Sequence, residues 1–303
     1  MKLPTSTDDL ITDGRLTNAV FELIKRTSSE LPADVEKALG QARLLEEPGT
    51  PAELIFAVFL ENIAAARSTQ APLCQDTGLP TFFIRHPRQV STAALTGIIR
   101  EAVRRATEEQ ILRHNAVDSL TGVNSGNNLG EGFPCLYFTE APQAALEISL
   151  LLKGGGSENV STQYSLPHGA LKAGRDLKGV RLVVLEAVAQ AAGMGCPPGV
   201  LGICIGGDRG GGYGEAKRQL LRRLDDVNPN PALAEMEAIL LREANCLGIG
   251  PLGLGGKTTL LGVKIGKLHR LPASFFVTVS YMCWECRRRT LIWEHDGAYA
   301  ISP

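Results

Sequence analysis

Six short apolar runs place the strongest constraint on the fold of this chain. They are TFFIRH, CLYFTEA, LEISLLL, VLGICIGG, LLGVKIGKL and FFVTVSYM. Several alternate apolar and polar residues, and each ends at glycine, proline or a polar cluster, which is typical of β-strands. Helical patterns at 180–192, 213–225 and 231–246 are mixed among these runs without a regular strand–helix–strand order. The sequence therefore predicts an α+β (irregular mixed α/β) fold rather than a clean βαβ series.

The first 70 residues have the pattern of helices. The segment Thr50-Pro51-Ala52-Glu53 combines an N-cap threonine, a proline at the first helical position and a capping-box glutamate. Residues 91–110 repeat the helical pattern, with an apolar face made of Leu95, Ile98, Ile99, Val103 and Ala106. We predict a single domain over residues 1–303, in which a helical part of about residues 1–70 packs on a mixed sheet.

Composition excludes several classes of partner. Hydrophobic residues make up 44% of the chain and charged residues 21%, so a core can be buried. The formal net charge of −1 gives no global field that attracts nucleic acid or a membrane surface. No stretch approaches the roughly 20 apolar residues that span a bilayer. The start, MKLPTSTDDLITDGRL, lacks the apolar core of a secretory signal. We therefore expect a cytoplasmic protein with no nucleic-acid or membrane partner.

The cysteines divide into two groups by their surroundings. Cys74, Cys196 and Cys283 each begin a polar or proline-rich turn at the mouth of a predicted element. Cys135, Cys204 and Cys246 lie within apolar runs or next to them, and we expect them to be buried small hydrophobes. The seven cysteines, with Cys286, are too few and too scattered for a disulfide scaffold.

The motif Cys283-x-x-Cys286 has two possible interpretations when taken by itself, a redox pair and a zinc site. A redox pair normally begins a helix in a thioredoxin-like unit, and a structural zinc site needs a second nearby pair, which the sequence lacks. A ferredoxin-type cluster is excluded because closely spaced cysteines are missing. Spacing alone leaves open a cluster held by distant cysteines.

Polar and glycine-rich turns are candidate binding segments. The runs 154–156 and 206–212 place backbone N–H groups where an anion can bind. The run Gly256-Lys257-Thr258 is a near miss of a phosphate loop, because the pattern needs glycine where Pro251 stands. Arg113 in Arg113-His114-Asn115 is a natural bidentate partner for a carboxylate.

Together and in this order, these motifs resemble the alpha subunit of class I fumarases and L-tartrate dehydratases, a region that also forms the N-terminal domain of the single-chain enzymes. The resemblance runs from about residue 20 to the C-terminus. The motifs that carry it are Cys74-Gln75-Asp76-Thr77-Gly78, Arg113-His114-Asn115, Gly154-Gly155-Gly156, Cys196-Pro197-Pro198, Leu247-Gly248-Ile249-Gly250, Gly255-Gly256-Lys257 and Cys283-Trp284.

The resemblance implies that Cys74, Cys196 and Cys283 bind a 4Fe–4S cluster and leave one iron open as a Lewis acid. It implies a hydro-lyase that reversibly adds or removes water at a small dicarboxylic acid, with fumarate and malate favoured. An L-tartrate or other substituted-dicarboxylate dehydratase is the alternative. The fold it implies is that of the class I fumarase N-terminal domain.

The resemblance also implies the substrate contacts. Gln75, Asp76, Arg113 and Gly155 would bind the dicarboxylate, and Asp76 and Arg113 would be catalytic. Further residues, including the base, come from a C-terminal domain or beta subunit in this family. The implied partner is therefore a beta subunit in a hetero-oligomer, alpha–beta or its double.

Two positions depart from the family pattern. Leu271 stands where relatives often carry a histidine twelve residues before the third cluster cysteine, and His269 is two residues away. Cys286 falls where some relatives have other residues, so it is expected not to be a ligand. A reading from another class is a non-catalytic iron–sulfur sensor, which needs neither Arg113 nor Asp76. The third interpretation is a zinc-binding structural protein built on Cys283 and Cys286.

Overall fold

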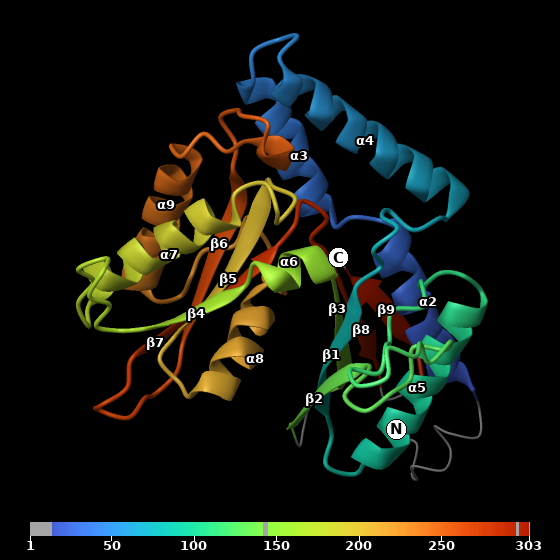
Figure 1. Ribbon diagram of the computed structural model, residues 1–303. Coiled ribbons are helices and arrows are strands. Elements are labelled where there is room, and N and C mark those ends of the chain that lie inside the picture. The colour runs from blue at the N-terminus through green and yellow to red at the C-terminus, as the bar shows by residue number, and fades with distance from the viewer. Residues whose placement is uncertain (1–13, 142–144, 295–296, 303) are drawn as a thin grey trace. The chain divides into compact units, whose positions relative to one another are not determined.

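A computed structural model describes residues 14–141, 145–294 and 297–302. It contains helices and two mixed sheets, so the predicted α+β class is confirmed (Figure 1). The chain divides into two compact units, each built from separate segments. The first unit comprises Met1–Pro32, Asn62–Lys153 and Arg287–Pro303, and the second comprises Ala33–Glu61 and Gly154–Cys286. The single domain expected over 1–303 stays a prediction.

The first unit is a five-stranded sheet with helices on one face (Figure 1). The strand order is β2 (Cys135–Glu140), β1 (Leu79–His86), β3 (Leu146–Lys153), β8 (Arg287–Trp293) and β9 (Tyr299–Ser302). The β1–β2 pair is parallel and the others are antiparallel. Helices α2 (Arg15–Ser29) and α5 (Thr92–Glu108) pack on this sheet around a core that includes Leu23, Phe82, Ile99, Leu150 and Leu291.

Strand β8 is a strand that the sequence analysis did not predict. It begins with Arg287, Arg288 and Arg289, yet all three are buried, with exposed fractions of 1%, 3% and 6%. The Arg287 guanidinium donates to the Asp76 backbone oxygen at 2.8 Å, and Arg289 pairs with the Glu30 carboxylate at 2.8 Å. Buried arginines are tolerated only with such partners.

The second unit is a four-stranded sheet with helices on both faces (Figure 1). The order is β4 (Thr162–Ser165), β7 (Phe276–Met282), β5 (Gly199–Ile205) and β6 (Leu260–Lys267). Successive residues of a strand face opposite ways. Leu201 and Ile203 therefore pack with α7 (Leu177–Ala191) and α9 (Pro231–Asn245), whereas Gly202 faces α8 (Arg209–Gln219). A Cβ at Gly202 would lie 2.1 Å from the Ala216 oxygen, so glycine lets α8 approach the sheet.

Most predicted elements are present. All six predicted strands form, and α4 (Pro51–Thr69) begins as expected, with the Glu53 N–H donating to Thr50 Oγ1 at 3.3 Å. The helix predicted over 213–225 was misplaced, because Asp208 caps an earlier start and the helix ends at Gln219. The elements not predicted, besides β8, are α6 (Gly155–Asn159), η1 (Pro251–Gly253), β4 and β9. Residues 1–13 of the predicted helical part lie outside the described residues.

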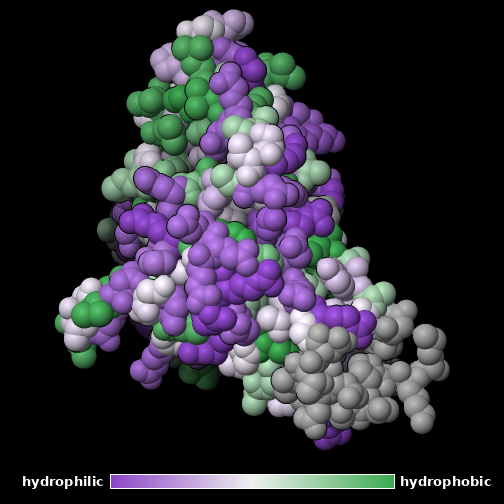
Figure 2. Space-filling model, turned by 90° about the vertical axis from the view of Figure 1, so that its right-hand side faces the viewer, coloured by the Kyte–Doolittle hydropathy of each residue, from purple (hydrophilic) through white to green (hydrophobic). Residues whose placement is uncertain are grey.

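Exposed apolar side chains gather where α3 (Ala33–Leu45) is followed by α4. Leu44, Leu45, Leu54 and Val58 are all more than half exposed, and hydrophobic residues are visible toward the top of the view in Figure 2. Among the described helices, none has the length and apolar character needed to cross a lipid bilayer.

Candidate active site

The loop of Cys74-Gln75-Asp76-Thr77-Gly78 is held by short-range hydrogen bonds. The Asp76 N–H donates to Cys74 Sγ at 3.4 Å, and Asp76 Oδ1 accepts the Gly78 N–H at 3.0 Å. Gly78 has φ of 80°, and a Cβ there would lie 2.7 Å from the Lys153 carbonyl carbon. Only glycine fits this turn. The loop therefore presents a sulfur atom that already accepts one backbone N–H.

Arg113 lies in a segment that a buried polar network ties to this loop. Its backbone N–H donates to Thr77 Oγ1 at 3.0 Å. The Asn128 amide donates to the Arg113 backbone oxygen at 2.7 Å and to Thr107 Oγ1 at 3.0 Å, and it accepts the Asn115 N–H at 2.7 Å. Asn128, Thr77 and Thr107 are at most 2% exposed. A fully paired buried network of this kind fixes the backbone of Arg113.

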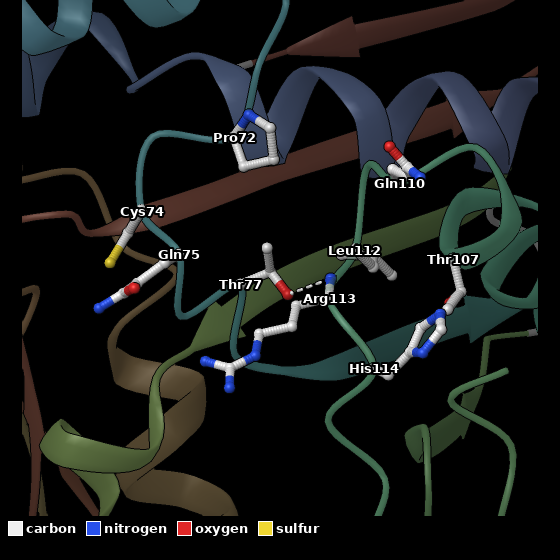
Figure 3. Close-up of a pocket in the computed structure, with 9 residues that line it drawn as sticks. All are labelled: Pro72, Cys74, Gln75, Thr77, Thr107, Gln110, Leu112, Arg113 and His114. Atoms are coloured by element: carbon white, nitrogen blue, oxygen red, sulfur yellow. Dashed lines mark hydrogen bonds between the residues drawn. The ribbon is translucent and has the colours of Figure 1, made fainter. Parts of the chain in front are cut away.

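A cavity of about 550 Å³ in the first unit brings three predicted site residues together, Cys74, Gln75 and Arg113. Their side chains extend toward the same side of the view, while the His114 ring lies on the other side of the Arg113 backbone (Figure 3). Asp76 is not among the lining residues. Among the described residues, the cavity is lined by Pro72, Cys74, Gln75, Thr77, Thr107, Gln110, Leu112, Arg113 and His114.

Sequence reasoning missed several of these residues. Thr77 and His114 stood inside motifs that had been singled out, but no role had been given to them. Thr107 lies in the last turn of α5 and Gln110 just after the helix, where the helical pattern gave no sign of a cavity. The polar run Asn124-Ser125-Gly126-Asn127-Asn128 was the feature of the sequence that could have indicated this network, because a buried amide needs hydrogen-bond partners.

The second unit brings Cys196 and Cys283 side by side. The Trp284 N–H donates to the Cys196 backbone oxygen at 3.2 Å. Cys196 is exposed and has φ of 51°, a left-handed conformation that is unfavourable for a residue with a Cβ. The Phe59 ring of α4 stacks on the Trp284 ring and helps to hold it in place. The two ring centroids are 4.0 Å apart.

Tyr281 supports the Cys196 loop from inside the second unit. A Cβ at Gly195 or Gly199 would lie 2.5 Å from the tyrosine ring, so both glycines are needed for this contact. Burial, and then the charges at Cys283 and Cys196, raise the pKa of Tyr281. Its hydroxyl is therefore a donor at neutral pH, yet it has no hydrogen-bond partner within the described residues.

The other cysteines differ from these three. Burial, with a smaller effect of Glu215, raises the pKa of the Cys204 thiol to about 12, which disfavours its thiolate. Cys286 is buried, and its Sγ lies 3.9 Å from the Leu220 oxygen. Cys246 was expected to be buried but is exposed, because it is the C-cap of α9. Cys135 is half-buried.

The glycine-rich candidates are already supplied with internal carboxylates. Asp208 Oδ1 accepts the Gly211 N–H at 2.6 Å and caps α8, where an anion had been expected. The near-miss phosphate loop gives three N–H···O contacts to the buried Glu46 carboxylate, from Lys257 and Thr258. Gly155, predicted to contact substrate, is exposed at the first position of α6.

Position 271 is separated from Cys283 within the second unit. Leu271 is 72% exposed in the loop before β7, and Cys283 follows the other end of that strand. Seven residues of strand span about 23 Å at about 3.3 Å per residue. A side chain at 271 therefore does not contact Cys283 within this unit.

The donor set fits an iron–sulfur cluster in its chemistry. All three predicted ligands are thiols outside any disulfide and lie on loops, and sulfur is the donor that such clusters prefer. The Tyr281 hydroxyl adds a buried donor whose ring packs against Gly195 and Gly199 around Cys196. Cys74 belongs to the first unit and the other two to the second, so neither unit alone holds three ligands. Among the residues that the structure describes, no group of three His, Cys, Asp or Glu side chains is placed so as to hold a metal ion.

Comparison with known proteins decides the family. The family model for fumarate hydratase (Fumerase) matches residues 17–292. The chain belongs to this fumarate hydratase family. The resemblance drawn from the Cys74–Gly78, Cys196 and Cys283 motifs is thereby confirmed.

Two relatives of the fumarate hydratase family differ in length. A Geobacillus stearothermophilus protein named "Putative fumarate hydratase class I" is 49% identical over 277 residues, covering 90% of this chain and 54% of that protein. The L(+)-tartrate dehydratase subunit alpha of Escherichia coli K12 is 32% identical over 286 residues, covering 93% of this chain and 92% of the subunit. The chain thus spans about half of the first relative and nearly all of the second.

Proposed function

We propose that this chain is the cluster-carrying alpha subunit of a 4Fe–4S hydro-lyase, which adds or removes water reversibly at a small dicarboxylic acid. The single observation that carries the proposal is the cavity shared by Cys74, Gln75 and Arg113. It combines a soft metal ligand with an amide and a guanidinium, the groups needed to hold a metal-activated carboxylic acid. Family membership over residues 17–292 supports the same reaction class.

Cys74, Cys196 and Cys283 are the proposed cluster ligands. These three residues would hold the cluster, which would supply a Lewis acid for a substrate oxygen. The Asp76 N–H on Cys74 Sγ and the Trp284 N–H on the Cys196 carbonyl hold two of these loops in place. Seven thiols without a disulfide favour a reducing compartment, which supports the cytoplasm as the location.

The substrate would be held by this chain through four residues. Arg113 pairs with a carboxylate in bidentate fashion, Gln75 donates from its amide, and the Gly155 backbone supplies an N–H. Asp76 holds or transfers a proton at its carboxylate, and the Gly78 N–H on its Oδ1 fixes the orientation. Thr77 and its network keep Arg113 from moving.

A beta subunit is the proposed partner. Arg113 is exposed, and an exposed ion pair contributes little because water screens it. Covering this cavity with a second subunit would remove that water and strengthen the pairing. The name of the Escherichia coli relative, L(+)-tartrate dehydratase subunit alpha, supports a two-subunit organisation.

Fumarate and malate are the favoured substrates, because the relative named for fumarate hydratase has 49% identity against 32% for the tartrate dehydratase subunit. L-tartrate is the second candidate, because that subunit matches this chain along nearly its whole length. Turnover of malate and of L-tartrate by the reconstituted alpha–beta pair decides between the two candidate activities.

The test begins with anaerobic reconstitution using iron and sulfide. We expect about four irons per chain for the wild type and loss of the intact cluster in Cys74→Ser, Cys196→Ser and Cys283→Ser. Cys246→Ser is the matched control, because this cysteine is exposed and lies outside the proposed set. A full cluster in any of the first three variants would contradict the ligand assignment. Iron-free wild-type protein holding only zinc would contradict the cofactor.

A further inference from the structure

The Tyr281 hydroxyl is a buried polar group that the proposed chemistry has not used. Tyr281 lies in β7 with an exposed fraction of 1%, and its Oη has no hydrogen-bond partner among the residues that the structure describes. Buried tyrosine hydroxyls usually find a partner, because leaving one unpaired costs the free energy of its lost hydration. The unpaired hydroxyl therefore needs an explanation.

Its surroundings point to the cysteine pair. The ring packs against Gly195 and Gly199, which bracket Cys196, and a Cβ at Gly199 would lie 2.6 Å from the tyrosine Oη. Tyr281 lies near the end of β7, and Cys283 follows two residues later, directly after the strand. The Trp284 N–H on the Cys196 carbonyl closes this arrangement. Tyr281 thus packs on the Cys196 loop and ends the strand that leads into the Cys283 loop.

We propose that Tyr281 donates a hydrogen bond to a sulfur of the centre held by Cys196 and Cys283, either a thiolate or a cluster sulfide. This inference rests on the proposed function, because it requires the cluster. Sulfur carries more negative charge in the reduced centre, so a donor stabilises that state and raises the reduction potential.

The test compares two tyrosine variants that each lose one oxygen. Tyr281→Phe keeps the ring that fills the space beside Gly195 and Gly199, so the fold is retained, which thermal unfolding checks. Tyr164→Phe is the control, because the Tyr164 hydroxyl lies 3.4 Å from the exposed Gln190 amide oxygen. Both proteins are reconstituted anaerobically and titrated potentiometrically, with the reduced cluster followed by electron paramagnetic resonance.

We expect equal iron content in all three proteins and an about tenfold smaller one-electron reduction constant in Tyr281→Phe, which is about 59 mV. Tyr164→Phe should match the wild type. A Tyr281→Phe protein with the wild-type potential overturns this inference and leaves the proposed function standing, since the cluster is then bound and a buried water is the partner. Wild-type protein that binds no cluster overturns the proposed function itself.

A second measurement removes dependence on the variant's folding. Replacing the tyrosines by fluorotyrosine in the wild-type chain makes the phenols stronger donors without removing any group. The potential should then rise, and it should rise equally in Tyr164→Phe. An unchanged potential after full fluorination overturns the inference.

Discussion

The backbone N–H of Arg113 donates a hydrogen bond to Thr77 Oγ1 at 3.0 Å. Thr77 also accepts from the Asn115 amide at 3.2 Å. One buried hydroxyl therefore ties the arginine segment to the loop that carries Cys74. A second contact between the two segments, from the Asn115 amide to the Gly78 oxygen at 3.2 Å, does not involve Thr77, so removing the Thr77 hydroxyl tests its own share of this link.

Thr77→Val keeps the shape of the side chain but removes this acceptor. The Arg113 N–H loses its acceptor, whereas the Asn115 amide keeps the Gly78 oxygen, so we expect a loss of about 1–2 kcal/mol in the free energy of unfolding. Because Arg113 is then less well positioned, KM for the dicarboxylate should rise about tenfold with a smaller change in kcat. Steady-state kinetics of the alpha–beta pair and urea unfolding measure both. Thr96→Val on the exposed face of α5 is the control, and equal kinetics in both variants would contradict the positioning role.

The carboxylate of Glu46 accepts the Lys257 N–H on both oxygens, at 2.8 and 3.0 Å, and the Thr258 N–H at 3.1 Å. Glu46→Gln removes the charge from these contacts, and charge-assisted hydrogen bonds are the stronger kind, so we expect about 2 kcal/mol of destabilisation. Glu47→Gln changes the neighbouring side chain, which is 76% exposed, and should cost almost nothing. Chemical unfolding compares them, and equal stabilities would show that the loop does not need the carboxylate.

Asp226 predicts a pH dependence for the second unit. Burial alone would raise the pKa of this carboxyl, but hydrogen bonds from Arg222 and Lys264 outweigh it and hold the pKa below its usual value. A lowered folded-state pKa contributes stability above the unfolded value of about 3.9 and loses it as the pH falls below that. The Lys264 side chain is 3% exposed, and its Nζ lies 2.6 Å from Asp226 Oδ1.

We therefore expect Asp226→Asn to cost about 2 kcal/mol at neutral pH, less than for a fully buried pair because Asp226 is partly exposed. The difference from the wild type should shrink below about pH 4, where the wild-type carboxyl also becomes neutral. Thermal unfolding from pH 3 to 8 measures this. A constant difference over that range would mean that the charge is not the cause.

Local patterns predicted most of the elements and failed where distant partners decide. Alternation in FFVTVSYM and capping at Thr50 act over a few residues, so one sequence suffices to read them. The run of three arginines reads as surface, yet β8 buries it because the Asp76 carbonyl and the Glu30 carboxylate accept from it across more than 200 positions. No residue close to position 287 in the sequence indicates that these acceptors are present.

The candidate site likewise contains some residues that the sequence predicted and others that it did not. Cys74, Gln75 and Arg113 were found through motifs, and the cavity joins them. The unpaired hydroxyl of Tyr281 was not found, because its strand pattern is that of any core tyrosine. Cys246 was misjudged for a related reason, since an apolar neighbourhood in sequence does not reveal that the residue caps a helix and faces water.

The path of the chain through the first unit has a consequence for its synthesis. Strand β3 is made well before its neighbour β8, and the segment between them, residues 154–286, belongs to the second unit. At about 5–20 residues per second, the edge of β3 waits on the order of 10 s for its partner strand. An unpaired edge of that kind invites wrong pairing with other chains. The nascent protein is thus most vulnerable to aggregation while the second unit is emerging, and slower translation of that segment should lower the yield of folded chain.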